Sequence, residues 1–127
     1  MPKLIYISHP ISGNVDENVR DILRICKKIH TKNIIPFAPY LVAVQYLDDK
    51  ISRERKLGIQ AGFECFSRKA MDELWLCGDK ISKGMKEEIK LAIKYKIPIK
   101  CYNKKLKSEF NKIKSNLWII LRNWLKK

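Results

Sequence analysis

The sequence predicts an α/β fold: a single-domain, Rossmann-like or flavodoxin-like three-layer sandwich with a parallel sheet of four or five strands in the order 2-1-3-4. Three observations carry this prediction. Short apolar runs alternate with longer amphipathic segments, the 127 residues suit one domain with its own core, and no internal repeat or linker divides them. Strands that alternate with helices indicate βαβ units and therefore a mostly parallel sheet.

Each expected element follows from its local pattern. Strands are predicted where apolar runs are short and rich in β-branched or aromatic residues, at 3–8, 33–39, 72–78 and 97–102. Helical spacing of apolar residues predicts helices over 15–30, 53–70 and 82–92, with Ser52 as the N-cap of the second. The segment 40–47 fits a short helix or a strand. Gly58 and Gly62 share a helix face, which favours close packing against a neighbour over ligand contact.

The end of the chain predicts an amphipathic helix attached to a domain of residues 1–102. Within residues 103–127, the apolar positions are Leu106, Phe110, Ile113, Leu117, Leu121 and Trp124. This helix is expected to pack on the domain or on a partner subunit, with its lysine-rich face outward. A surface for anionic lipid, for nucleic acid or for a protein partner remains an alternative.

The charge and the cysteines limit the compartment and the ligands. The net charge is +14, of which residues 102–127 hold +7 and the rest of the chain the other +7. Such a charge attracts nucleotides or nucleic acid, and it equally fits a solvated lysine-rich surface. The four cysteines are scattered in apolar runs, and no leader or apolar run of about 20 residues is present. We therefore expect a cytoplasmic protein without a membrane span.

Two loops predict the position of a ligand site. Parallel sheets bind ligands at the carboxyl ends of the strands where the strand order reverses, here between the first and third strands. The loops 8–14 and 78–84 end there, and both lead into helix N-termini, which favour phosphate. Ser12, Gly13, Ser82 and Gly84 are small enough to cradle a phosphate, and His9 lies in the same loop. No metal-ligand spacing, P-loop or dinucleotide motif occurs, so no cofactor is expected.

One carboxylate is predicted to point inward. In a helix over 82–92, Met85, Glu88, Ile89 and Ala92 share one face, whereas Glu87 lies on a solvated side. Burying a carboxylate is costly unless it is paired or its pKa shifts. Beside a phosphate cradle, such a carboxylate suits attack on a sugar carbon or stabilisation of an oxocarbenium-like centre.

Three motifs together resemble a known superfamily: "IYISHP" at 5–10, "DELWLCG" at 72–78, and S-x-G-x-x-x-E-I-x-x-A at 82–92. The combination resembles the nucleoside 2-deoxyribosyltransferases, the related nucleoside 5′-monophosphate N-glycosidases, and small bacterial and phage proteins of the same fold. The resemblance implies that Glu88 is the nucleophile and that Ser82 and Gly84 grip the sugar or its 5′-phosphate. It further implies a bacterial cytosol, a phage origin among the options, and a homo-oligomer.

The resemblance also assigns the remaining contacts of a nucleotide or nucleoside ligand. It implies that Asp79 orients the base or sugar. It also implies contacts from Tyr6, Pro10, Ser12, Gly13, Tyr40, Asp48 and Arg55, although Arg55 equally fits a solvated charge on a helix surface. Ser8, His9 and Met85 are added because they lie in or beside the two predicted site loops.

Three functions follow as expectations. The first is an enzyme, an N-glycosidase (hydrolase) or deoxyribosyltransferase acting on a (deoxy)nucleoside 5′-monophosphate. The alternative is a non-catalytic nucleotide-binding protein, for example a phage anti-defence protein that sequesters a nucleotide signal in the same pocket. The third is a protein-binding inhibitor that acts through its basic surface.

Overall fold

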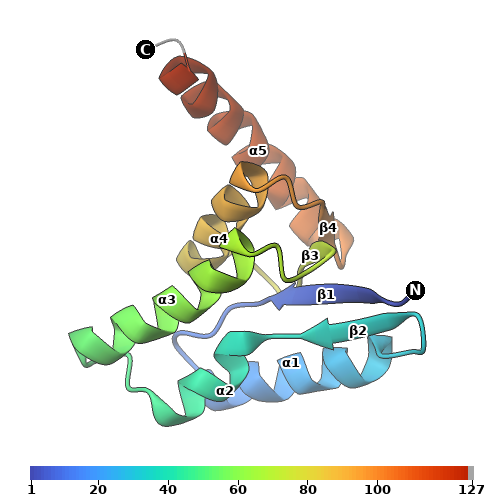
Figure 1. Cartoon of the computed structure of the whole chain (residues 1–127), viewed down its shortest axis with the longest axis vertical. Helices are drawn as coiled ribbons and strands as arrows, with labels where there is room; N and C mark the ends of the chain where they lie inside the picture. Colours follow the sequence, from blue (N-terminus) through green and yellow to red (C-terminus); the bar gives the residue numbers. More distant parts are fainter. Residues whose placement is uncertain (126–127) are drawn as a thin grey trace.

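A computed structural model describes residues 1–125 and contains a sheet of four parallel strands (Figure 1). The strand order is β2-β1-β3-β4, as predicted. β1 (Lys3–Ser8) is central and pairs with β2 (Ile34–Phe37) and β3 (Glu73–Leu76), while β4 (Ile99–Cys101) extends the sheet beyond β3. The order therefore reverses beside β1, so the end of β1 borders the position where ligands bind in such sheets.

Five helices connect and cover the strands within the described residues: α1 (Val15–Ile29), α2 (Pro39–Tyr46), α3 (Ser52–Ser67), α4 (Lys83–Lys94) and α5 (Lys104–Leu125). The segment 40–47, which the sequence left open, is mostly helical, because Pro39 begins α2 where a missing N–H does no harm. The prediction that Ser52 caps α3 is wrong. Ser52 is already the first helical residue, and the cap residue Ile51 offers no side-chain hydrogen bond.

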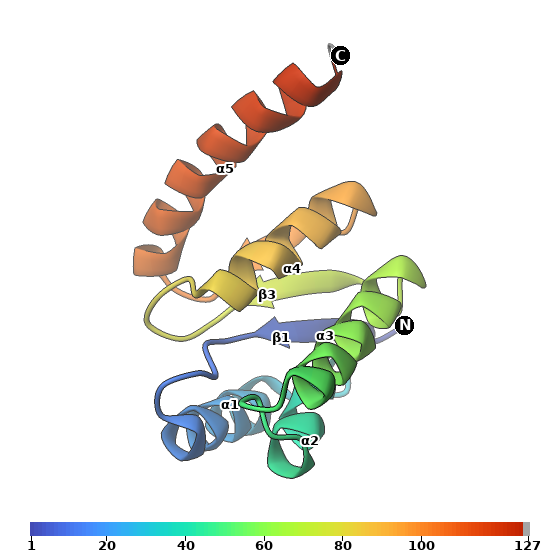
Figure 2. The same ribbon diagram turned by 90° about the vertical axis from the view of Figure 1, so that its left-hand side faces the viewer.

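Alternation along β1 divides the core into two clusters. Ile5 and Ile7 face α1, where they pack with Ile22. Tyr6 and Ser8 point to the opposite face, which α3 and α4 cover; Figure 2 shows these two helices in front of the sheet. Because side chains alternate strictly in a strand, Tyr6 and Ser8 reach the same side and can act on the same partner.

The apolar face of α5 packs against the same cluster as α4, which confirms the amphipathic prediction over its first half. Leu106 and Leu117 are buried, and Phe110 and Ile113 pack partly against them. The helix then extends away from the sheet (Figures 1 and 2). Leu121 and Trp124 lie outside the residues whose side chains the structure describes. None of the helices within residues 1–125 has the length and hydropathy of a membrane span.

A buried acid connects β3 to the strands on either side. Glu73 is 5% exposed and accepts hydrogen bonds from Lys3 Nζ at 2.7 Å and from Trp75 Nε1 at 2.9 Å. Lys3 binds Oε2 of Glu73, whereas Lys100 Nζ lies 3.3 Å from Oε1, the oxygen that Trp75 also binds. Burial alone would raise the pKa of Glu73, but the hydrogen bonds from Lys3, Trp75 and Lys100 outweigh burial and lower it to about 2. An ionised Glu73 therefore stabilises the fold above the pKa of the unfolded chain.

We expect Glu73→Gln to lower the free energy of unfolding at pH 7 by about 2–3 kcal/mol. The folded pKa lies below the unfolded value, so the contribution is present above pH 4.5 and is lost as the pH falls towards 2. Urea unfolding of the native chain and of Glu73→Gln at pH 7 and near pH 2 measures the difference in the free energy of unfolding. Glu64→Gln, at an exposed ion pair with Arg68, is the control and should change little. An equal loss at both pH values would contradict the prediction.

Candidate functional site

A groove opens between α3 and α4 at the carboxyl end of β1. Its volume is about 790 Å³, within the range of about 300–1,000 Å³ that is typical of small-molecule sites. The loops 9–12 and 80–84 form one end, and α2 and α3 supply the opposite wall. Ten of the residues predicted as contacts line it: Tyr6, His9, Pro10, Ser12, Tyr40, Arg55, Ser82, Gly84, Met85 and Glu88.

Glu88 lies on the floor of this groove, with both carboxyl oxygens bound by hydroxyls of β1. Ser8 Oγ donates to Oε1 at 2.7 Å, and the Tyr6 hydroxyl donates to Oε2. Within residues 1–125, no Lys, Arg or His forms an ion pair with Glu88. The neighbouring Glu87 is 62% exposed and pairs with Lys90 at 3.2 Å. The two adjacent glutamates thus point as the helix periodicity predicts.

The surroundings of Glu88 favour a protonated carboxyl near neutral pH. Burial raises its pKa from 4.5 to about 7, although the hydrogen bonds from Tyr6 and Ser8 act in the opposite direction. Burial, and then the charge of Glu88, raise the pKa of Tyr6 well above its usual value of 10. Tyr6 therefore remains a hydrogen-bond donor at all ordinary pH values, while Glu88 changes its charge within the physiological range.

Aromatic packing fixes the position of the Tyr6 hydroxyl. The ring of Tyr6 lies 4.9 Å from that of Phe66, 5.7 Å from Phe37 and 6.0 Å from Tyr40, between centroids. The Tyr40 hydroxyl donates to the carbonyl of Ile7 and is thereby held against β1. The hydroxyl that binds Glu88 is thus restrained from several sides.

The glycines of α3 form the part of the groove that faces Tyr6. A Cβ atom at Gly62 would lie 3.7 Å from the Tyr6 hydroxyl oxygen, and one at Gly58 would lie 3.7 Å from Leu47. Both are ordinary packing distances, but both glycines also line the groove. The sequence interpretation favoured packing over ligand contact and did not predict that both glycines line the groove. The i, i+4 spacing of the glycines was the signal, because two missing side chains on one helix face leave space there.

The N-terminus of α4 lies at the end of the groove that the loops 9–12 and 80–84 form. Ser82 is its N-cap: Oγ accepts a hydrogen bond from the backbone N–H of Met85 at 3.3 Å, and the Ser82 N–H points to the Met85 sulfur at 3.4 Å. The charges that line the groove are mixed, with Asp49, Glu54 and Glu87 opposing Arg55, Lys80 and Lys83. Selection of a phosphate here would rest on the free N–H groups of the helix start rather than on net charge.

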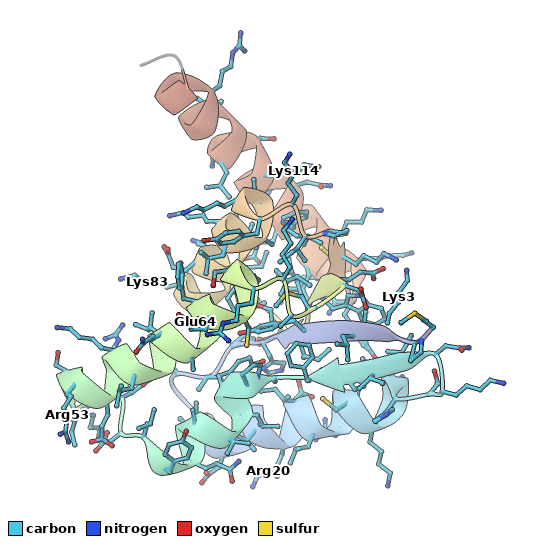
Figure 3. All side chains as sticks on the ribbon, in the orientation of Figure 1. Lys3, Arg20, Arg53, Glu64, Lys83 and Lys114 are labelled. Carbon is cyan, nitrogen blue, oxygen red and sulfur yellow. The ribbon has the colours of Figure 1, made fainter. Side chains whose placement is uncertain are left out.

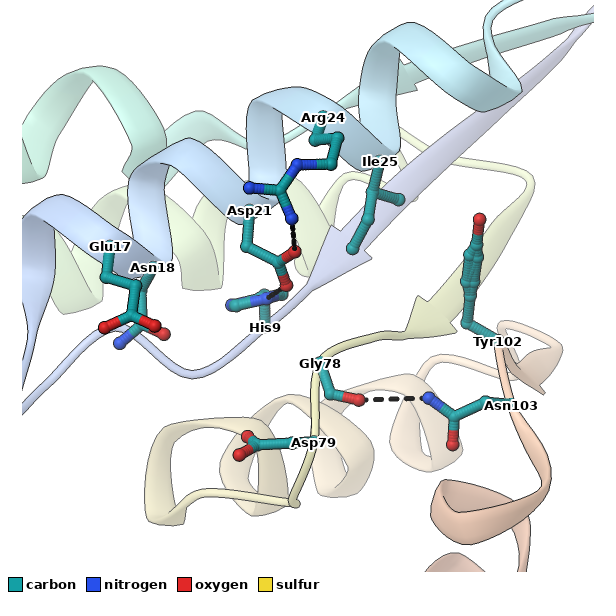
Figure 4. Close-up of a pocket in the computed structure, with 10 residues that line it drawn as sticks. All are labelled: His9, Glu17, Asn18, Asp21, Arg24, Ile25, Gly78, Asp79, Tyr102 and Asn103. Carbon is teal, nitrogen blue, oxygen red and sulfur yellow. Dashed lines mark hydrogen bonds and ion pairs between the residues drawn. The ribbon is translucent and has the colours of Figure 1, made fainter.

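His9 lines the groove, but its ring nitrogens are engaged elsewhere. The ring lies among α1 residues at a second pocket of about 540 Å³ (Figure 4). Nδ1 lies 2.7 Å from the carbonyl oxygen of Pro10, which can only accept, and Nε2 lies 2.6 Å from Asp21 Oδ2. Arg24 holds the other oxygen of Asp21 at 3.1 Å. His9 thus connects the β1 loop to α1, a role that the sequence did not predict.

Gly78 allows the β3 loop to reach this histidine. Its φ of +94° is in the region that favours glycine, and a Cβ atom there would lie 2.7 Å from Pro10 Cδ and 3.2 Å from the ring of His9. The close contact between the two loops therefore requires glycine at this position.

Three predicted contacts lie away from the groove. Gly13 occupies an exposed turn with φ +100° and nothing near its Cβ position. The carboxylate of Asp48 accepts the backbone N–H of Lys50 at 2.9 Å, and its neighbour Asp49 lines the groove in its place. Asp79 lines the second pocket (Figure 4), because the turn at Gly78 directs it to the α1 side. Ser8, in contrast, is buried and acts through Glu88.

Comparison with known proteins adds one match. The family model described as "Domain of unknown function (DUF7768)" matches residues 3–102, from β1 to the residue after β4. No match is found among curated proteins. Within the described part of the chain, no group of three or more His, Cys, Asp or Glu residues is arranged to hold a metal ion.

The inward-facing carboxyl of Glu88 predicts an unusual dependence of stability on pH. Because the folded pKa of about 7 lies above 4.5, Glu88 holds its proton longer in the folded chain, and stability falls as the pH rises from 4.5 to 7. We expect Glu88→Gln to be more stable than the native chain at pH 8, by up to about 3 kcal/mol, and about equal to it at pH 4.5.

Urea unfolding of the native chain, Glu88→Gln and the matched control Glu87→Gln at both pH values tests this expectation. The control removes an exposed carboxylate from the adjacent position and should follow the native chain. A Glu88→Gln protein that is less stable than the native chain at pH 8 would contradict the assignment of Glu88 as a destabilising buried charge.

Proposed function

We propose that this chain, which belongs to the family of the domain of unknown function DUF7768, cleaves or transfers the N-glycosidic bond of a (deoxy)nucleoside 5′-monophosphate. One observation carries the proposal: Glu88 is a half-buried carboxyl on the floor of a groove, held by two neutral hydroxyls without a cation of the described chain. An acid with only a structural role is normally paired or solvated. Carboxyls with raised pKa values in clefts are candidates for catalysis.

The reaction follows from what an unpaired carboxylate can do at an anomeric carbon. An ionised oxygen of Glu88 attacks C1′, the bond from C1′ to the base nitrogen breaks, and the base takes a proton from solvent as it leaves. Water then attacks C1′ of the glycosyl ester, the bond from C1′ to the Glu88 oxygen breaks, and the water's second proton passes to solvent, which releases the sugar phosphate and regenerates the carboxylate. A second base in place of water gives transfer. Tyr6 and Ser8 hold the carboxyl in one orientation throughout, which lowers the entropic barrier to attack.

The groove also supports the choice of a 5′-phosphate. The first residues of α4, Lys83–Met85, lie three to five positions before Glu88 and line the same groove. Ser82 Oγ already accepts the N–H of Met85, so the N–H groups of Lys83 and Gly84 and the side chains of Lys80, Lys83 and Arg55 are the donors suited to an anion. A sugar placed over Glu88 with its phosphate at this helix start would leave the base against the apolar wall of α2 and α3, which includes Leu47, Ile59 and Phe63.

Capture without turnover is the second candidate, and one observation favours it. Both oxygens of Glu88 already accept a hydrogen bond, and its raised pKa keeps much of it neutral at pH 7. A neutral carboxyl binds a nucleotide without attacking it. The same groove would then hold an intact nucleotide, as in the sequestering protein that the sequence left as an alternative.

We expect the native protein to release free base from at least one member of a panel of nucleosides and nucleoside 5′-monophosphates in ribo and deoxy form. Glu88→Gln, which keeps the shape of the side chain, should reduce the rate by about 10³-fold or more. Liquid chromatography of the reaction products measures both. Glu64→Gln is the control and should retain the native rate, because the Glu64 side chain is exposed, pairs with Arg68 and does not line the groove.

The outcomes separate the two candidates. Free base from the native protein but not from Glu88→Gln supports N-glycosidic cleavage. A nucleotide that disappears from solution and returns intact after denaturation supports capture. Unchanged nucleotides in every sample, with no binding, would reject both functions.

The pH profile tests the role of Tyr6. With Glu88 as nucleophile, kcat/KM should rise with pH through about 7 as the carboxyl loses its proton. The hydrogen bond from Tyr6 lowers the pKa of Glu88, so Tyr6→Phe should move this rise to higher pH, and Ser8→Ala should do the same. A profile that keeps its midpoint in Tyr6→Phe while only the plateau falls would assign Tyr6 a purely structural role.

A further inference from the structure

The positive charge of the chain is concentrated in one half of the molecule. Residues 1–79 carry 12 Lys and Arg against 10 Asp and Glu, whereas residues 80–125 carry 13 against 3. The excess of positive over negative charge outside the C-terminal helix is therefore not spread evenly. Most of it lies on the loop before α4, on α4 itself and around β4. Together with α5, these elements lie at the β3–β4 end of the sheet (Figure 1).

The side chains of this half leave most of its positive charge without an ion-pair partner among the described residues. All 13 Lys and Arg residues of 80–125 are exposed. Of the three acids, Glu88 is turned into the groove, and Glu109 accepts the backbone N–H of Ile81 at 3.2 Å. Only Glu87 shares the exposed face of α4, where it pairs with Lys90 at 3.2 Å. Among the described residues, only Lys90 and Lys100 of these 13 form ion pairs. Figure 3 shows Lys83 on α4 and Lys114 on α5 among the outward side chains.

The lysines of α4 form a regular stripe. Lys83, Lys86, Lys90 and Lys94 follow one another at steps of three, four and four residues, which places them on one face. That face lies opposite the buried residues Met85, Ile89 and Ala92. At a rise of 1.5 Å per residue the stripe is about 16 Å long, which matches the length of several successive phosphates of a nucleic acid strand. Lys83 also lines the groove, so the stripe begins at its mouth.

We propose that the outer face of α4, together with the exposed lysines of α5, binds the phosphate backbone of nucleic acid without base specificity. Lysine is a point charge suited to phosphate, and a row of such charges gains affinity by releasing counterions. A lipid surface fits less well, because membrane-bound helices turn an apolar face to the lipid. The apolar faces of α4 and of the first half of α5 are instead buried in the core. This inference does not depend on the reaction at Glu88.

Fluorescence anisotropy with a labelled oligothymidylate of about 20 nucleotides, and with a duplex of the same length, tests the proposal over about 50–200 mM salt. The triple variant Lys86→Gln, Lys90→Gln, Lys94→Gln should bind at least tenfold more weakly, with a salt slope reduced by about 2. Glutamine keeps the helix propensity of lysine, so α4 should remain folded. Circular dichroism checks that it does.

The matched control is Lys27→Gln, Lys28→Gln, Lys32→Gln, which removes the same charge from exposed positions on and near α1. It should bind within about twofold of the native chain. Glu88→Gln should also bind the oligonucleotide normally, which separates this result from the enzymatic proposal. Equal losses in both triple variants, no oligonucleotide binding at all, or binding only to vesicles of phosphatidylserine and phosphatidylcholine would each overturn the proposal.

Discussion

The contact between Glu88 and the two hydroxyls of β1 is the interaction on which the site depends. It joins residues that are 80 and 82 positions apart in the chain, and it requires β1 to present Tyr6 and Ser8 on the face that α4 covers. A one-residue slip of β1 would direct Ile5 and Ile7 to Glu88 and leave an ionisable group against apolar side chains. The register of the central strand and the chemistry of the carboxyl are therefore set by the same alternation.

The groove remains open beside that contact. Hydroxyls hold the carboxyl without neutralising it, so the charge of Glu88 is relieved only by a proton or by a ligand that enters the groove. The opposite wall includes Gly62, which faces Tyr6, and Gly58, which faces Leu47, and neither fills the groove with a side chain. A helix that packed there with larger residues would close the groove and complete an ordinary core. The two glycines thus lower the stability of α3 but leave space in the groove beside the Glu88 carboxyl.

The fold and the inward carboxyl could be predicted from the sequence because both follow from local periodicity. The alternation of strands and helices predicted the parallel sheet. The position of Glu88 on an otherwise apolar helix face predicted that its side chain points inward. The positions of the predicted contacts that lie away from the groove depend instead on turns. The turn at Gly78 directs Asp79 to the α1 side, and the turn before α3 places Asp49, rather than Asp48, at the groove. The bond between His9 and Asp21 was missed because neither residue has a pattern that marks the other as its partner. Side-chain pairing across elements needs the three-dimensional arrangement, whereas a helix face does not.

The distribution of charge indicates that the surface of α4 and α5 attracts anions, whereas the groove selects among them. The residues that line the groove carry nearly balanced charges, so net charge there distinguishes little among anions. The surface of α4 and α5, in contrast, is almost entirely positive and exposed, and it begins at Lys83 on the rim of the groove. Such a surface raises the local concentration of any phosphate compound and loses this effect as salt is added. Discrimination must then arise inside the groove, from hydrogen-bond donors at fixed positions and from the apolar wall. Because donors and wall act over contact distances, they remain effective at salt concentrations that screen the lysines.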